Sequence, residues 1–455
     1  MTNTNQNNLK DISDKYIDYA NCIYSYSRTD FQFGVDNTIK QVVVILSPPR
    51  GGSSLLYEIM AKTGLFLLLD GEQTPYYKLG KATYPYNNIF SDEIKNGDLH
   101  NIDVKKIKDR IFDDLRVLTF ADDFDVEKYF PFVIRKLSVQ WPSFQLSYDR
   151  WKEIVMAAYR RLKMAYGYWN TDLFYLEIVK VLREIGLPVN PRYYDLPKLF
   201  IEEFASQPLL GPPDPWFCIE EPPFVKVRPC SPPTKNDLKL KPLLLKTSID
   251  IYRLSLIHEL FFDAEIKYIY LTRNPASSIN GLYDGWLDRG FFSHNVSNHA
   301  SLQIEGYSDM FDWGGQWWKF DLPPDWKKHT REPLLDVCKF QWKAAHNKVN
   351  EIQGMIFSSD NNANAIRIKF EHLVNSLETR HAVLQEIYRF INIGQKENWI
   401  RGINQLPVVM STFEPLRARW LLRKSVIWAA ITNDFDLITI TERLGYKFSE
   451  VEKWI

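Results

Sequence analysis

The stretch QVVVILSPPRGGSSLLYEIM, residues 41–60, predicts a buried strand, a tight turn and a helix in direct succession. Residues 42–46 are apolar and mostly β-branched, which is typical of a strand, and Pro48 and Pro49 end it because proline cannot continue a central strand. Apolar residues then recur at helical spacing between Leu55 and Met60. Such a turn presents free backbone N–H groups and the positive end of a helix dipole at one point, which favours the binding of a phosphate.

The side chains of this turn also suit an anion. Gly51 and Gly52 let the backbone approach a ligand closely. Ser53 and Ser54 are expected to cap the helix and to donate to phosphate oxygens, and Arg50 adds a positive charge. An ordinary strand-to-helix turn with a serine cap is the alternative without a ligand. A nucleotide triphosphatase loop is disfavoured, because it carries lysine directly before its Ser or Thr, where this chain has glycine.

Four more apolar runs predict strands, at residues 65–69, 243–246, 266–271 and 365–370. Charged residues stand at or just past the ends of three of them, namely Glu72, Lys246 and Arg273. Ligands bind at the carboxyl ends of the strands in open α/β sheets, so these side chains are candidates for one site. The pattern predicts an α/β fold with a central parallel sheet and helices on both faces.

The composition limits the classes of function. The chain has 455 residues with 56 basic and 56 acidic side chains, so no net charge attracts it to nucleic acid or to an anionic membrane. Four scattered cysteines without a CxxC pair indicate reduced thiols rather than a metal site. The N-terminal residues lack the pattern of a signal peptide, and no apolar run is long enough to span a bilayer. These features predict a cytoplasmic protein without membrane insertion.

The segment PPRGGSSLL resembles the 5′-phosphosulfate loop of sulfotransferases that use 3′-phosphoadenosine 5′-phosphosulfate (PAPS), whose pattern is roughly P-[KR]-S-G-T-[TS]. Arg50 matches the basic position and Gly52 the glycine of this pattern. Ser53 and Ser54 match its pair of hydroxyl residues, whereas Gly51 replaces its serine. The resemblance implies that these five residues bind the donor.

A second segment, YLTRNP, resembles the 3′-phosphate motif of the same family, in which the arginine holds the 3′-phosphate. The arginine is Arg273 here, and a structural ion pair is its alternative role. The family has a serine eight residues later, where this chain has Gly281. Asn280, Ser278 and Ser277 are the candidates to replace that serine.

Two weaker similarities complete the resemblance, which covers about residues 41–75 and 243–375. IKFEHLV, residues 368–374, resembles the family's V-R-Y-E-D-L strand. WLLRK offers Arg423 and Lys424 as the basic residues of a late loop that closes over the donor, although the family's glycines are missing.

The resemblance implies a P-loop-like, three-layer fold with helical or irregular insertions. Residues 1–40 are expected to form an N-terminal extension, disordered over residues 1–10 and then containing a short helix. The resemblance also implies that residues 41–455 form a sulfotransferase domain, with insertions at about 81–240 and 290–333 that are expected to shape the acceptor pocket. The aromatic residues of the insertions suggest a large, partly apolar acceptor.

The implied reaction moves a sulfuryl group from PAPS to a hydroxyl or amine of a small-molecule or glycan acceptor, without a metal, and leaves 3′-phosphoadenosine 5′-phosphate (PAP). A bacterial enzyme of secondary metabolism or glycan tailoring fits this layout. Arg50 is the expected cation at the leaving oxygen, and Lys246 is either a second one or a solvated strand-end lysine.

The general base is expected to be Glu72. The segment Gly-Glu-Gln-Thr, residues 71–74, resembles the G-E-E-T of one branch of the family, whereas the Thr-His step of another branch reads Thr247-Ser248 here. There are two alternatives. Glu72 has a structural role, or the base is one of His258, His294 and His299.

Two other functions stay open on the sequence. A nucleotide-dependent kinase is disfavoured by the missing loop lysine and the lack of an obvious magnesium carboxylate. A catalytically silent nucleotide-binding scaffold is supported by the missing serine at position 281 and the missing histidine at position 248.

Overall fold

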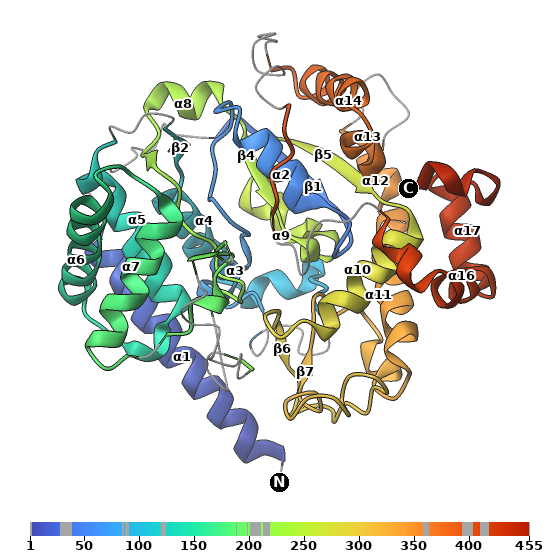
Figure 1. Cartoon of the computed structure of the whole chain (residues 1–455), viewed down its shortest axis with the longest axis horizontal. Coiled ribbons are helices and arrows are strands. Elements are labelled where there is room, and N and C mark those ends of the chain that lie inside the picture. The colour runs from blue at the N-terminus through green and yellow to red at the C-terminus, as the bar shows by residue number, and fades with distance from the viewer. Residues whose placement is uncertain are drawn as a thin grey trace.

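Four parallel strands form the central sheet of the computed structural model, in the order β4-β1-β5-β8 (Figure 1). They are β1 (Gln41–Leu46), β4 (Leu243–Lys246), β5 (Glu265–Thr272) and β8 (Ala365–Lys369). The first strand in the chain pairs on both sides, so that Val44 of β1 lies opposite Leu245 in β4 and Tyr268 in β5. The predicted α/β fold with a central parallel sheet is confirmed.

The structure describes residues 2–27, 39–83, 86, 91–119, 124–187, 189–197, 199–200, 211–212, 219–357, 364–393, 404–409 and 418–454. Two short antiparallel pairs join β2 (Val117–Leu118) to β3 (Cys230–Ser231) and β6 (His294–Asn295) to β7 (Trp317–Trp318).

The α-helices are α1 (Thr2–Tyr26), α2 (Ser53–Ala61), α3 (Thr74–Leu79), α4 (Val104–Asp113), α5 (Val126–Gln140), α6 (Tyr148–Tyr166), α7 (Thr171–Glu184), α8 (Lys235–Leu240), α9 (Leu254–Leu260), α10 (Pro275–Leu287), α11 (Leu334–Glu351), α12 (Gln353–Ile356), α13 (Phe370–Val374), α14 (Leu377–Phe390), α16 (Lys424–Thr432) and α17 (Phe435–Arg443). Short 3₁₀ turns are η1 (Asn96–Asn101), η2 (Pro142–Phe144), η3 (Pro191–Tyr193), η5 (Ser248–Tyr252), η6 (Trp326–His329), η7 (Arg419–Arg423) and η8 (Phe448–Trp454). None of the described helices is both long and apolar enough to cross a bilayer.

The sheet is buried on both faces, as its continuous apolar strands require. Successive side chains of β1 enter two separate cores, because neighbours along a strand point to opposite faces. Val42, Val44 and Leu46 pack into a core with residues of α9, α10 and α11. Val43 and Ile45 pack into a second core with residues of α2, α5 and α7. The result is three layers, helix, sheet and helix, with α5 to α7 gathered on one side of the molecule and α16 and α17 on the opposite side (Figure 1).

The run at residues 65–69 is not the regular strand that its apolar sequence predicts. Leu67 forms one parallel bridge to Leu243, and Leu68 forms one antiparallel bridge to Arg116. The segment therefore lies beyond the β4 edge of the sheet but turns from one partner to another within two residues. The side chains of residues 66–69 are nevertheless buried, which explains why the sequence looks like a strand.

The N-terminal segment differs from its prediction, since α1 begins at Thr2 instead of after a disordered stretch. Ile17, Ala20 and Tyr24 of this helix are buried in the first core. Tyr24 also donates a hydrogen bond of 2.6 Å from its Oη to Oδ2 of the buried Asp114. These contacts hold the second half of α1 against the body of the protein.

Candidate functional site

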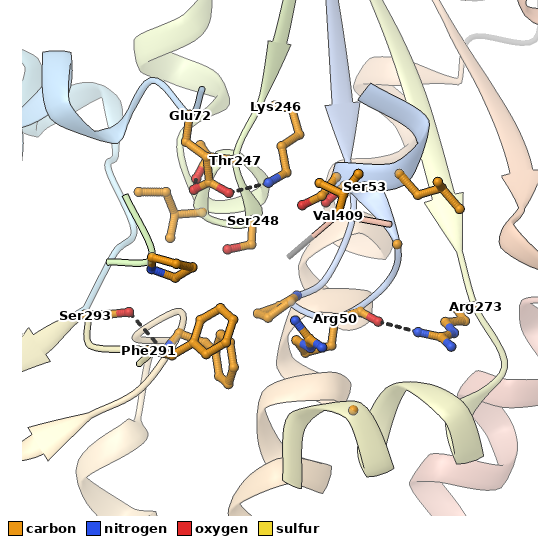
Figure 2. Close-up of a pocket in the computed structure, with 18 of the residues that line it drawn as sticks. Arg50, Ser53, Glu72, Lys246, Thr247, Ser248, Arg273, Phe291, Ser293 and Val409 are labelled. Atoms are coloured by element: carbon orange, nitrogen blue, oxygen red, sulfur yellow. Dashed lines mark hydrogen bonds and ion pairs between the residues drawn. The ribbon is translucent and has the colours of Figure 1, made fainter. Parts of the chain in front are cut away.

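A cavity of about 630 Å³ opens at the carboxyl ends of β1, β4 and β5. Its walls fall into two groups. Residues within 49–55, 273–284, 370–375, 406–409 and 418–420 form what we call the loop half. Residues within 72–83, 220–225, 246–253 and 291–295, with Asp92, Trp317 and Phe320, form the far half. The predicted phosphate loop and the predicted base therefore open onto one space (Figure 2).

The turn after β1 is held in an uncommon backbone conformation. Arg50 and Gly52 have φ angles of 61° and 97°. A Cβ atom on Gly52 would lie 2.2 Å from the ring of Phe370, so only glycine fits between the loop and α13. This glycine is the N-cap of α2, without a side-chain hydrogen bond, so the prediction that Ser53 or Ser54 caps the helix is wrong. Ser53 is instead the first residue of the helix, because the left-handed turn ends one position earlier.

The N-terminus of α2 is left open to a ligand. Within the described part of the chain, the N–H groups of Gly52, Ser53 and Ser54 and both serine hydroxyls have no hydrogen-bond acceptor. All three residues line the cavity. Unpaired N–H groups at a helix N-terminus form a ready site for an anion.

Arg50 lies between the two halves of the cavity. Its guanidinium carbon is 5.5 Å from the centre of the Phe291 ring. Burial lowers the pKa of Arg50 to about 10, and the charge of Arg273 lowers it in the same direction, whereas Asp288 and Asp284 raise it. The side chain therefore keeps its positive charge at neutral pH.

Arg273 leaves the end of β5 and reaches the loop. Its Nη1 donates a hydrogen bond of 3.1 Å to the backbone carbonyl of Arg50, and its guanidinium stacks 4.5 Å from the centre of the Phe370 ring. Its Nε is buried and has no hydrogen-bond partner among the residues described. Arg273 forms no ion pair within that part of the chain, which speaks against the structural ion pair considered from the sequence.

Gly281 of α10 packs against the arginine of the loop. A Cβ atom on Gly281 would lie 3.2 Å from Cβ of Arg50, which is tighter than ordinary contacts. A serine at this position therefore requires Arg50 to shift by a few tenths of an ångström. Ser277, one turn earlier on α10, lines the cavity, whereas Ser278 is fully buried and does not.

Asn280 lines the cavity but is engaged by its neighbours. Its Oδ1 accepts a hydrogen bond of 2.8 Å from Nη1 of Arg423, and its Nδ2 donates one of 3.1 Å to Asp284. Among the three predicted replacements for the missing serine, Ser277 thus has the position and a hydroxyl without a described partner.

The late basic segment is only partly brought to the site. Arg423 pairs with Asp284 at 2.8 Å and lies beside the cavity, and Lys424 is exposed at the start of α16. Neither residue lines the cavity. The cation that does is Arg419, whose Nε also pairs with Asp284, at 3.0 Å. Arg419 was not predicted from the sequence, where its one signal is its place one helical turn before Arg423.

Glu72 and Lys246, predicted separately from two distant segments, are in direct contact. Nζ of Lys246 pairs with Oε1 of Glu72, and the hydroxyl of Thr247 donates a hydrogen bond of 2.8 Å to Oε2 (Figure 2). The side chain of Glu72, which lines the cavity, is 38% exposed, whereas Lys246 is buried. An ion-paired carboxylate is thus held at the cavity surface by the end of β4.

A buried network behind this pair was not predicted. The side chain of Gln73 accepts a hydrogen bond of 3.2 Å from the backbone N–H of Lys246 and donates to Asp250. Tyr77 donates a second hydrogen bond, of 2.9 Å, to Asp250. Burial raises the pKa of Asp250 to about 7. The network fixes the end of β4 and, through it, the position of Glu72.

The histidines considered from the sequence lie in different places. His294 lines the far half and pairs through Nε2 with Asp92 at 3.3 Å. Asp92 is buried, and His294 and Arg253 hold its pKa down to about 2 against the effect of burial. His258 and His299 do not line the cavity. Within the described ranges, no cluster of three His, Cys, Asp or Glu side chains is arranged to hold a metal ion.

Comparison with known proteins gives two similar structures. No protein-family model matches the chain, and no curated protein matches it significantly. A sulfotransferase domain from the Synechococcus PCC 7002 olefin synthase is 12% identical, with a TM-score of 0.36 over 92% of this chain and 100% of that one. A sulfotransferase domain from the curacin biosynthetic pathway is 11% identical, with a TM-score of 0.34 over 90% and 99%. With TM-scores this low, the two neighbours carry no argument about function, and the chemistry of the cavity has to be derived from its own residues.

Proposed function

We propose that the protein is a sulfotransferase that transfers a sulfuryl group from PAPS to a hydroxyl or amine of an acceptor. One observation supports this proposal above all: an anion-binding helix N-terminus and an ion-paired carboxylate line the same cavity. We call the first of these the anion cradle. The cradle is the open N-terminus of α2 with Arg50 and Arg273 beside it. The carboxylate is Glu72, held by Lys246.

The residues of the loop half fit a nucleotide with phosphates at both the 5′ and 3′ positions. The open N–H groups of Gly52, Ser53 and Ser54 suit the 5′-phosphate. Arg273, whose Nε has no described partner, and Ser277 suit the 3′-phosphate, since arginine binds phosphate through several donors at once. Arg419 adds a third cation at this wall.

When bound, PAPS supplies a sulfur that exchanges its bond to the 5′-phosphate oxygen for a bond to the acceptor atom. Arg50 holds a positive charge next to the phosphate oxygen, which keeps the electron pair. Glu72 takes the proton of the acceptor. Lys246 and Thr247 orient this carboxylate from β4 through an ion pair and a hydrogen bond.

We place residues 41–455 in one domain, with the insertions at about 81–240 and 290–333 supplying most of the far half. Residues 220–225 and 291–320 of these insertions contribute side chains to it. Cys22, Cys230 and Cys338 are unpaired, in keeping with a cytoplasmic enzyme. A role in secondary metabolism is part of the same proposal.

The test is calorimetric titration with PAP, repeated with ATP and magnesium. We expect micromolar binding of PAP that is lost in Arg273→Ala and kept in Arg150→Ala, whose arginine is exposed on α6. Binding of ATP with magnesium in preference to PAP would indicate a kinase instead. Absence of binding to either nucleotide would overturn the proposal.

A further inference from the structure

The far half of the cavity has one aromatic wall. Phe291 and Phe320 are half-buried there, with ring centres 5.7 Å apart and planes tilted by 39°. Gly285 of α10 makes room for this arrangement, because a Cβ atom on it would lie 2.4 Å from the Phe320 ring. The backbone N–H of Phe320 donates a hydrogen bond of 3.1 Å to Oγ of Ser293. The aromatic surface is therefore fixed in place.

The opposite wall consists of ion pairs. Figure 2 shows Glu72, Lys246, Thr247 and Ser248 across the open space from Phe291. Elsewhere in the far half, Lys78 pairs with Glu221, and Asp92 pairs with Arg253 at 2.8 Å and with His294. Glu220, also in the far half, pairs with the buried Lys136 at 2.8 Å. We call these ion pairs together the ion-paired wall.

This wall offers many hydrogen-bonding groups without a net charge. Each carboxylate that lines it has a cationic partner, so the charges balance locally. The side chains of Glu72 and Glu221 are also partly exposed, at 38% and 22%. The wall therefore presents strong acceptors and strong donors close together.

These two walls together select one chemical class of acceptor. A hydroxyl group both donates and accepts, so a ring that carries several hydroxyls matches a wall of paired acids and bases. The C–H face of the same ring matches an aromatic plate. A phenol or an alkyl alcohol would exclude water from the ion pairs without replacing the lost hydrogen bonds. Burial of polar groups without hydrogen-bond partners is unfavourable. A charged amine or acid would disturb a wall that is already balanced.

We infer that the acceptor is an uncharged saccharide, with a sugar ring on Phe291 and Phe320 and its hydroxyls on the ion-paired wall. This inference rests on the proposed sulfotransferase function and narrows its acceptor. The hydroxyl nearest Glu72 gives up its proton to that carboxylate as its oxygen bonds to sulfur.

The first experiment measures transfer of ³⁵S-labelled sulfate from PAPS to three pools of acceptors. The pools are neutral methyl glycosides with disaccharides, phenols with straight-chain alcohols, and primary amines. We expect at least tenfold faster labelling of the saccharide pool than of either other pool. Faster labelling of phenols, alcohols or amines overturns the saccharide inference and leaves the sulfotransferase function standing. Binding of PAP without labelling of any saccharide also overturns the inference, whereas failure to bind PAP overturns the proposed function itself.

The second experiment changes the aromatic wall. Phe320→Ala and the bulkier Phe320→Leu are each expected to raise KM for the best saccharide about tenfold, with PAP affinity unchanged. Phe311→Ala is the matched control, because Phe311 belongs to the same insertion, stacks 5.1 Å from Trp313 and does not line the cavity. PAP titration of each variant shows that the loop half is intact. An unchanged KM in Phe320→Leu with intact PAP binding contradicts the stacking of a sugar on this wall.

Discussion

Arg273 and Arg50 are 223 positions apart in the chain, yet Nη1 of the first donates a hydrogen bond of 3.1 Å to the backbone carbonyl of the second. The bond links the residue after β5 to the turn after β1, on adjacent strands of the sheet. Both ends of the proposed nucleotide site are therefore fixed relative to one another before a ligand arrives. Such preorganisation lowers the free energy needed to order the site on binding.

Replacement of the loop arginine should remove most of the activity. Arg50→Ala deletes the cation proposed for the leaving oxygen, and loss of one such group typically lowers kcat about 10²- to 10³-fold. Arg50→Lys should recover part of the rate, since it restores the charge. Steady-state kinetics with labelled PAPS measure this effect. Arg150→Ala, on the exposed face of α6, serves as the control, and equal rates in both alanine variants would refute the role of Arg50.

Introduction of a serine at position 281 should lower the proposed activity instead of raising it. In Gly281→Ser the new Cβ lies 3.2 Å from Cβ of Arg50 and pushes that side chain from its place. We expect kcat of Gly281→Ser to fall about tenfold. Ser277→Ala, in contrast, should weaken the binding of PAP. Gly97→Ala is the control, because a Cβ there meets no atom within 4 Å. A rise in activity in Gly281→Ser would show that Arg50 has room to move and would contradict this prediction.

Neutralisation of the proposed base should separate chemistry from binding. Glu72→Gln keeps the size of the side chain and its contact with Thr247 but does not accept the acceptor's proton. A positioned general base typically contributes about 10²- to 10⁴-fold, so kcat should fall by that factor. Calorimetry with PAP should give the wild-type affinity. Should His294→Gln reduce kcat more than Glu72→Gln does, the base is the histidine of the Asp92 pair.

Acid should destabilise the fold partly through one buried histidine. Burial lowers the pKa of His346 on α11 to about 3, and Arg443 lowers it in the same direction. The unfolded chain binds a proton below about pH 6.5 that the folded state excludes, so stability is complete above that pH and is lost as pH falls toward 3. Each pH unit in this window is worth about 1.4 kcal/mol, so the expected loss is about 2 kcal/mol between pH 6.5 and pH 5.

His346→Gln should remove this dependence. Glutamine stays neutral and retains polar atoms near Oη of Tyr270, which contacts Nδ1 of the histidine. Urea unfolding at pH 7 and pH 5 measures the difference in free energy of unfolding between the two conditions. His100→Gln, at an exposed position of η1, should behave like the wild type. A variant that loses as much stability in acid as the wild type would show that other groups dominate.

The strands were predictable because strands buried on both faces of a sheet appear in the sequence as continuous apolar runs. Four continuous apolar runs became β1, β4, β5 and β8, and the turn after β1 was read correctly as the opening of a helix. The same rule failed at residues 65–69, where burial without a regular hydrogen-bonded partner leaves the same apolar run. Glu72 and Lys246 were both predicted as site residues from their places after apolar runs, but the direct contact between them was not predicted.

The parts that were not predictable depend on contacts across the chain. Nothing local shows that Gly281 packs against Arg50, that Gln73 links Lys246 to Asp250, or that Arg419 lines the cavity in place of Lys424. Helix α1 was also underestimated, because its stability comes from partners such as Asp114 that lie far along the sequence.

The order β4-β1-β5-β8 has a consequence for how such a protein diversifies. Most residues of the loop half belong to the segments that follow the core strands, whereas many residues of the far half belong to the long segments inserted between those strands. Residues 220–225 and 291–320 lie outside the strands that precede Arg50 and Arg273, so the side chains of these two segments that face the cavity can vary while the loop half keeps its sequence. The buried residues of the second segment, such as Trp318, belong to the core and are excluded from that freedom.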